Sequence, residues 1–174
     1  MLKMKKKAYF FTLDAFIATG VIAVGIVLIL FTTTNKPYEM QTAFLSQDLI
    51  DTISSIKVYQ ISDNNYIYEL IEEGSITNPE NTILDQIGEF SYRGMNDTAS
   101  NFTKTILPGI IPNEYNFQLL IKEGDIIKFN YIKLKSIGTL RNTSKAVASS
   151  KNIIFGLSDS TMWGPYIAEV RTWQ

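Results

Sequence analysis

The chain has 174 residues and a formal net charge of −1, and it contains neither histidine nor cysteine. Without cysteine there is no disulfide framework, thiolate zinc site or thiol nucleophile, and without histidine there is no Ser-His-Asp triad or imidazole metal ligand. The hydrophobic fraction of 45% excludes a disordered chain, and the charge is wrong for a general nucleic-acid binder. We therefore expect no enzyme, no cofactor, no metal and no nucleic-acid partner.

Positive charge is concentrated at the amino terminus. The first seven residues contain four lysines, and when these are set aside residues 8–174 carry a net charge of −5. Lysines beside an apolar segment tend to stay on the cytoplasmic side of a membrane. The asymmetry therefore predicts a cytoplasmic amino terminus and an exported body.

A long apolar segment follows the lysines, and Asp14 is the one charged residue between Lys7 and Lys36. About 20 apolar residues are enough for a helix to cross the hydrocarbon core, so we expect a transmembrane helix over residues 9–35. A secretory signal peptide has a shorter apolar region of ~7–15 residues that ends in a small-x-small site, which is not found before Thr32. A core helix of a soluble protein is the other alternative, and the adjacent lysines argue against it.

Asp14 has two interpretations, which the sequence leaves open. A carboxylate inside a membrane segment costs roughly 2.5–3.5 kcal/mol at the centre and usually has a partner. In the first interpretation Asp14 lies near the headgroups in the first turns of the helix, where the positive helix end stabilises it. In the second it pairs with a positive group of a neighbouring copy and sets the axial stagger of a helical bundle.

The string KKKAYFFTLD, Lys5 to Asp14, resembles the start of archaeal type IV pilin-like surface proteins, which carry a class III signal peptide. The resemblance implies that residues 1–8 are a basic leader, removed by a prepilin-type peptidase at Lys7-Ala8 so that Tyr9 becomes the new terminus. Asp14 would be the acidic residue that pairs with the terminal amine of the adjacent subunit. It would be sixth after this cut, whereas the family's acidic residue is usually fifth.

The same resemblance implies that the apolar helix forms the core of a filament of identical subunits. The residues expected to pack there are Phe10, Phe11, Leu13, Phe16, Ile17, Val21, Ile22, Val24, Ile26, Val27, Leu28, Leu30 and Phe31.

Residues 36–174 are expected to form the exported head, which begins with helices. Apolar residues at helical spacing from Phe44 to Ile56 predict a helix that continues the stem after a break near Pro37. A short helix is expected over residues 67–73. A stronger one is expected to start at Asn78-Pro79 and to divide at Gly94 into two consecutive helices.

The last third of the chain has the period of two that is typical of half-buried strands. Strands are expected over residues 115–122, 126–134, 146–155 and 166–173. Helices followed by strands predict an α+β head, in which helices pack on one face of a roughly four-stranded antiparallel sheet. Strings such as WGPYIAEVRTW, Trp163 to Trp173, also resemble uncharacterised archaeal surface proteins of this architecture, which carry no firm activity.

Three Asn-x-Ser/Thr sequons make Asn96, Asn101 and Asn142 candidate N-glycosylation sites on an exported body. We expect modification of Asn96 and Asn142 more than of Asn101, which precedes the apolar Phe102. Ser158 follows Gly156 at the spacing of a nucleophilic serine, but the motif lacks a second glycine and a histidine base, so we expect an ordinary turn residue. The acidic residues near Glu72 are expected to form a solvated helix face instead of a calcium site.

These features together predict a structural subunit of an archaeal type IV pilus-like filament, with a role in adhesion or cell-surface contact. Its partners would be identical subunits, the membrane before assembly, the prepilin-type peptidase and an assembly platform. The protein would lie in the cell membrane and then at the cell surface in an extracellular filament. The first alternative is a signal-anchored single-pass protein with an exported binding domain, such as a minor pilin or assembly factor. A second is a membrane-tethered enzyme that uses two facing carboxylates.

Overall fold

A computed structural model describes residues 3–33, 37–61, 63–134 and 147–173, and it describes side chains from residue 12 to 31 and from residue 43 onward. The chain divides into two compact units, residues 1–40 and residues 41–174. We call the second unit the body. Among the described residues there are five α-helices and one antiparallel sheet of four strands, so the chain is α+β with an apolar amino-terminal helix.

Two helices account for the first third of the chain. Helix α1 spans Lys3–Thr33 and α2 spans Pro37–Ser55, and residues 34–36 between them, where the break near Pro37 was predicted, lie outside the described residues. Proline suits the first turn of α2, because the amide hydrogen that it lacks would have no partner there. In the body, α2 buries Leu49, Ile50 and Ile53. Phe44, which the periodicity placed on that apolar side, is instead 64% exposed.

Three short helices follow α2. Helix α3, Asn65–Glu72, α4, Ile83–Tyr92, and α5, Asn96–Ile106, are joined by turns, and Gly94 divides α4 from α5 with a φ of 74°. The predicted start of α4 at Asn78-Pro79 is wrong. Thr82 caps α4, because its Oγ1 accepts a hydrogen bond from the backbone N of Asp85 at 3.1 Å. Short 3-10 turns at Val58–Ile61 and Leu107–Gly109 complete the helical part.

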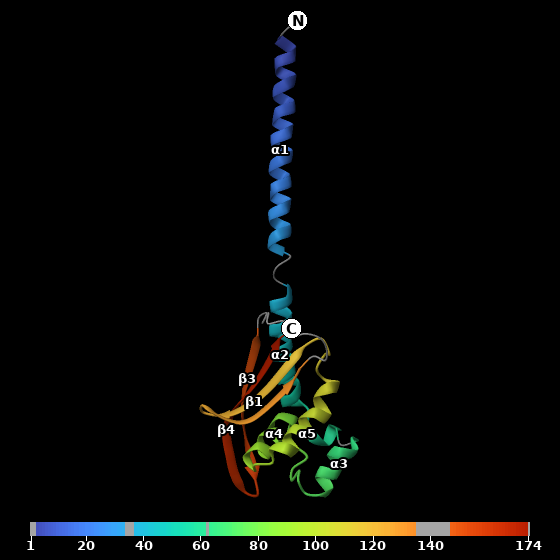
Figure 1. Cartoon of the computed structure of the whole chain (residues 1–174), viewed down its shortest axis with the longest axis vertical. Helices are drawn as coiled ribbons and strands as arrows, with labels where there is room; N and C mark the ends of the chain where they lie inside the picture. The colour runs from blue at the N-terminus through green and yellow to red at the C-terminus, as the bar shows by residue number, and fades with distance from the viewer. Residues whose placement is uncertain (1–2, 34–36, 62, 135–146, 174) are drawn as a thin grey trace. The chain divides into compact units, whose positions relative to one another are not determined.

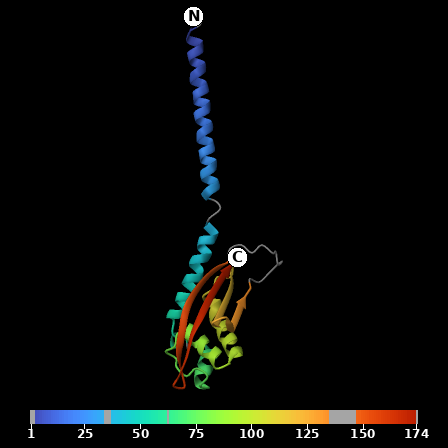
Figure 2. The same cartoon turned by 90° about the vertical axis from the view of Figure 1, so that its left-hand side faces the viewer.

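The four strands form an antiparallel sheet in the order β2-β1-β4-β3. Strand β1 spans Asn116–Glu123, β2 Ile126–Lys133, β3 Ala148–Ser158 and β4 Thr161–Trp173. All four were predicted, but β4 begins at Thr161 instead of Tyr166. Strands β3 and β4 form a long hairpin whose turn has positive φ at Asp159 and Ser160, as a two-residue turn between twisted strands requires (Figures 1 and 2).

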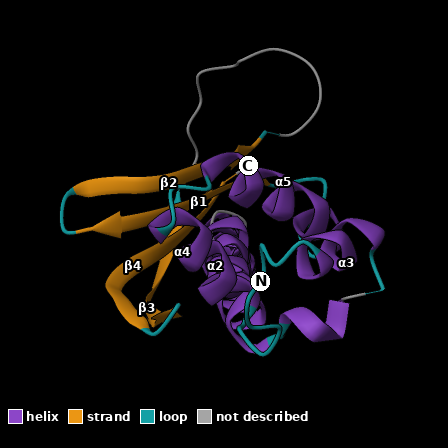
Figure 3. Cartoon of the chain, turned by 90° about the horizontal axis from the view of Figure 1, so that it is seen from below, coloured by secondary structure: helices purple, strands orange, loops and turns teal. Residues whose placement is uncertain are grey.

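The helices cover one face of the sheet, as predicted (Figure 3). The body's core lies between the two layers and joins Ile87 and Phe90 of α4 to Phe117, Leu119 and Val170 of the sheet. The rings of Phe90 and Phe102 meet edge to face, with centroids 5.6 Å apart. The opposite face of the sheet, which we call the outer face, has no covering layer among the described residues.

Candidate functional site: the amino-terminal helix and the outer sheet face

Helix α1 is apolar on all sides and exposed. From Thr12 to Phe31 it is long and apolar enough to cross a membrane, and none of this span is buried within the structure. Twenty helical residues rise about 30 Å, which matches the hydrocarbon thickness of a bilayer. A helix that is apolar on every face needs an apolar environment around it, either lipid or other helices.

The residues predicted to pack in a filament core lie along α1. From Leu13 to Phe31 those side chains are between 47% and 82% exposed. Phe10 and Phe11, and the predicted processing residues Lys7, Ala8 and Tyr9, belong to the α1 backbone, and their side chains lie outside the described ones.

Asp14 is exposed on α1, and no ion pair of Asp14 is found among the described residues. The helix begins at Lys3, so in the uncut chain Asp14 lies about three turns beyond its start. The stabilising effect of a helix end fades within about one turn. In the uncut chain the positive helix end therefore contributes little at Asp14, whereas removal of residues 1–8 would place Asp14 in the second turn.

Two of the candidate glycosylation sites lie on helix α5. Asn96 and Asn101 are both exposed, but Thr103, the third residue of the second sequon, is fully buried. Asn142 lies outside the described residues.

Ser158 is not the turn residue that we predicted. It ends strand β3, is 4% exposed, and its Oγ donates a hydrogen bond to Oε1 of the buried Glu89 at 3.2 Å. Thr77 and Asn81 also donate to the Glu89 carboxylate, at 3.1 and 2.9 Å, and Arg93 lies 3.7 Å from it. This cluster ties the loop before α4 to the β3–β4 hairpin. The cluster contains one acidic residue, Glu89, and its hydrogen bonds hold the loop and the hairpin together, so its role is structural.

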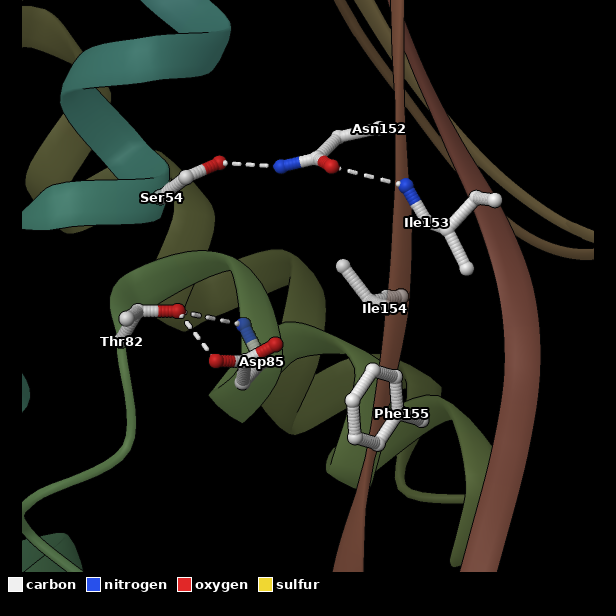
Figure 4. Close-up of a pocket in the computed structure, with 7 residues that line it drawn as sticks. All are labelled: Ser54, Thr82, Asp85, Asn152, Ile153, Ile154 and Phe155. Carbon is white, nitrogen blue, oxygen red and sulfur yellow. Dashed lines mark hydrogen bonds between the residues drawn. The ribbon is translucent and has the colours of Figure 1, made fainter.

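Acidic residues do not converge elsewhere in the part of the chain that is described. No group of three or more acidic side chains lies there in an arrangement that could hold a metal ion. A pocket of about 320 Å³ opens between α2, the start of α4 and the edge of β3 (Figure 4). Its one acidic residue is Asp85, which accepts a hydrogen bond from Thr82, and Ser54 and Asn152 are joined across its mouth at 3.0 Å.

The outer face of the sheet carries a buried carboxylate. Glu169 is 3% exposed and accepts hydrogen bonds from Lys122 at 2.7 Å, Arg171 at 2.7 Å and Ser149 at 2.9 Å. Desolvation raises the pKa of Glu169, but these hydrogen bonds and the Arg171 charge outweigh it and lower the pKa to about 2. Glu169 is therefore ionised at neutral pH and pairs with two cations, Lys122 and Arg171, on the outer face.

The same face carries an apolar surface at the hairpin, which the sequence analysis missed. Ile153 pairs with Ile167, and Leu157 pairs with Met162. These four side chains, which we call the hairpin patch, are 65%, 40%, 67% and 65% exposed. Phe155, which lies between Ile153 and Leu157 on β3, is also 60% exposed. The alternation of Ile153, Phe155 and Leu157 was the available signal, but it does not tell which face of a strand is covered.

Comparison with protein-family models, with curated proteins and with solved structures finds no match to this chain.

Proposed function

We propose that this chain is a pilin-like structural subunit of an archaeal type IV pilus-like surface filament. The observation that carries the proposal is helix α1, whose Thr12–Phe31 span is apolar on all sides and entirely unburied, joined to an α+β body. The segment from Lys5 to Asp14 resembles the start of pilins, and this resemblance is the reason for proposing a pilin-like subunit. The leading role is assembly, with adhesion or surface contact by the body.

Assembly would exchange the lipid around α1 for identical helices. Helices in a bilayer associate through close packing and polar contacts instead of the hydrophobic effect, because lipid is as apolar as their own side chains. In water the gain is larger, at about 25 cal/mol per Å² of apolar surface buried. Side chains as exposed as Phe16, at 82%, and Phe31, at 70%, would keep the helices together once the filament leaves the membrane.

Asp14 would give this assembly its register. A carboxylate among apolar helices is costly unless a positive group meets it, so subunits that slide along one another would lose the pair. Removal of residues 1–8 would create an amine at Tyr9, which is the positive group that the pilin resemblance assigns to Asp14.

The first experiment measures processing and assembly in the native host. Mass spectrometry of material sheared from cells should find this chain in fibres, with its terminus at Tyr9, and electron microscopy should show the fibres. A full-length chain that retains the leader, and that is monomeric in detergent and absent from sheared material, would contradict the subunit and favour the solitary signal-anchored protein.

A second experiment tests Asp14 directly. Asp14→Asn should leave the chain processed and in the membrane but reduce fibre yield at least tenfold, because the amide cannot make the charge pair. Asp97→Asn, on the exposed face of α5, is the matched control and should assemble normally. Normal fibre yield from Asp14→Asn would remove Asp14 from the mechanism.

A further inference from the structure

The hairpin patch is large for a surface that faces water. With about 150–200 Å² for a complete apolar side chain, the exposed fractions of its four residues and of Phe155 leave roughly 500 Å² of apolar surface. The largest apolar patch on a typical monomer is about 300–600 Å² and is often functional. One side of a standard interface buries about 800 Å², of which more than half is apolar. The patch therefore has the apolar area of one complete interface.

The hairpin patch lies at the end of the body away from the start of its α2 segment. Ser46 of α2 hydrogen bonds to Ser150 of β3, and Ser54 further along α2 hydrogen bonds to Asn152, so helix and strand run in the same direction. Residues 153 to 162 therefore lie beyond the end of α2, at the end of the body opposite residue 41 (Figures 1 and 2).

The exposed side of α2 is complementary to this surface. Phe44, Asp48 and Asp51 fall on one face of the helix and are all exposed, and Phe44 is 64% exposed. Beside the hairpin patch, Lys151 is exposed on the outer face, next to Ile153. Among the described residues, neither Asp48 nor Lys151 makes an ion pair within the chain.

The spacings also agree. Phe44 and Asp48 are about 6 Å apart along the helix axis, and Ile153 and Lys151 are about 7 Å apart along the strand. An apolar group and a charge are thus separated by the same distance on both surfaces, and the charges have opposite sign. The buried side of α2 packs under the helix-covered face of the sheet, so the two surfaces lie on opposite sides of the body.

We infer that the hairpin patch binds a second copy of this chain, through the exposed face of that copy's α2, with Phe44 on the patch and Asp48 beside Lys151. The contact joins two different surfaces, so each added copy presents a free surface to the next, and the association continues into an open helical polymer when the rotation between copies does not close a ring. This inference rests on the proposed function, and it names the contact between bodies that accompanies the packing of the α1 helices.

Disulfide cross-linking tests the contact. The native chain has no cysteine, so every cross-link must come from the introduced residues. Fibres assembled from a mixture of Phe44→Cys and Leu157→Cys chains should form disulfide-linked dimers that contain one chain of each kind. Leu157→Cys alone should form none, because in this arrangement two hairpin patches do not meet. In fibres, the thiol of the Leu157→Cys variant should react with a maleimide at least tenfold more slowly than in detergent-solubilised monomer.

Charge reversal tests the pair. Lys151→Glu and Asp48→Lys should each reduce fibre yield about tenfold, because like charges then face one another across the contact. The double variant should recover most of the yield. Lys104→Glu, on the exposed side of α5, is the matched control and should assemble as the native chain does.

The outcomes separate this inference from the proposed function. Fibres that form normally with Lys151→Glu, with no mixed cross-link and with a freely reactive thiol in the Leu157→Cys variant, would overturn the α2 contact and leave the filament proposal standing. Cross-linking of Leu157→Cys to itself would replace it with a symmetric contact and overturn it as well. A native chain that never forms fibres would overturn both.

Discussion

Gly88 of helix α4 lies directly against the ring of Trp163 in strand β4. A Cβ atom added at Gly88 would come within 2.7 Å of Cη2 of Trp163, and one added at Gly156 would come within 2.7 Å of Cζ2. The indole therefore fills the space that two side chains would occupy, and it stacks on Tyr92 with centroids 6.5 Å apart. Trp163 joins the hairpin to the helical layer.

This packing predicts that Gly88→Ala destabilises the body. Alanine favours a helix over glycine by about 1 kcal/mol, but overpacking a rigid ring costs about 1–3 kcal/mol, so we expect a net loss of up to about 2 kcal/mol. Urea unfolding of the detergent-solubilised chain, followed by tryptophan fluorescence, measures it. Gly109→Ala is the control, because nothing lies within 4 Å of its added Cβ, and it should change stability by less than about 0.5 kcal/mol.

The lowered pKa of Glu169 leads us to predict that the body loses stability in acid. Its pKa is about 2 in the folded protein and 4.5 ordinarily. Above pH 4.5 both states are ionised and the full stabilisation is present. As the pH falls from 4.5 towards 2, the unfolded chain takes up a proton that the folded protein does not, so stability declines, by about 2–3 kcal/mol in total.

Glu169→Gln should remove this stabilisation at pH 7 and flatten the decline between pH 4.5 and 2. The measurement is the free energy of unfolding at several pH values. Glu80→Gln is the control: Glu80 pairs with Lys57 at 2.6 Å, but the two side chains are 63% and 43% exposed, so its loss should cost less than about 1 kcal/mol. An unchanged acid profile in Glu169→Gln would show that other groups control acid unfolding.

The elements of the body could be predicted from periodicity, but their ends could not. Asn78-Pro79 has the appearance of a helix start, yet the Asn78 side chain accepts a hydrogen bond from the backbone N of Glu80 and closes a turn. Thr82 makes the same kind of bond to Asp85 and does start α4. The last strand was predicted to start at Tyr166, but β4 also includes Gly164, where an added Cβ would lie 2.8 Å from the backbone O of Ile154, so close pairing with β3 requires the glycine.

Of the candidate sites, the apolar helix could be predicted from the sequence and the hairpin patch could not. The length and composition of α1 are local properties, so the sequence suffices to predict an apolar helix over that span. The hairpin patch is not local, because period two shows only that Ile153 and Leu157 share a face. Which face is covered depends on Trp163, which fills the space at Gly156, and on Ser46, which bonds to Ser150. The large side chains are therefore left outside.

We predict that the stability of the body depends strongly on the buried carboxylate of Glu89. Its side chain is fully buried and accepts from Thr77, Asn81 and Ser158. Glu89→Gln would present an amide to these donors and leave some of them without an acceptor, so we expect a loss of about 2–4 kcal/mol in urea unfolding. Glu69→Gln, on the exposed face of α3, should change stability by less than about 0.5 kcal/mol. Equal effects of the two substitutions would contradict the anchoring role.

We predict that the two sequons on helix α5 differ in glycosylation. Asn96 is exposed at the start of the helix, whereas the sequon of Asn101 has its threonine, Thr103, fully buried, with Oγ1 bonded to the backbone O of Ala99 at 2.7 Å. A glycan that is attached to the folded body needs the whole sequon to be accessible, so Asn96 should be modified and Asn101 should not. Glycopeptide mass spectrometry of the native protein measures both, and Asn96→Gln should remove the added mass. A glycan on Asn101 would show instead that attachment precedes the folding of α5.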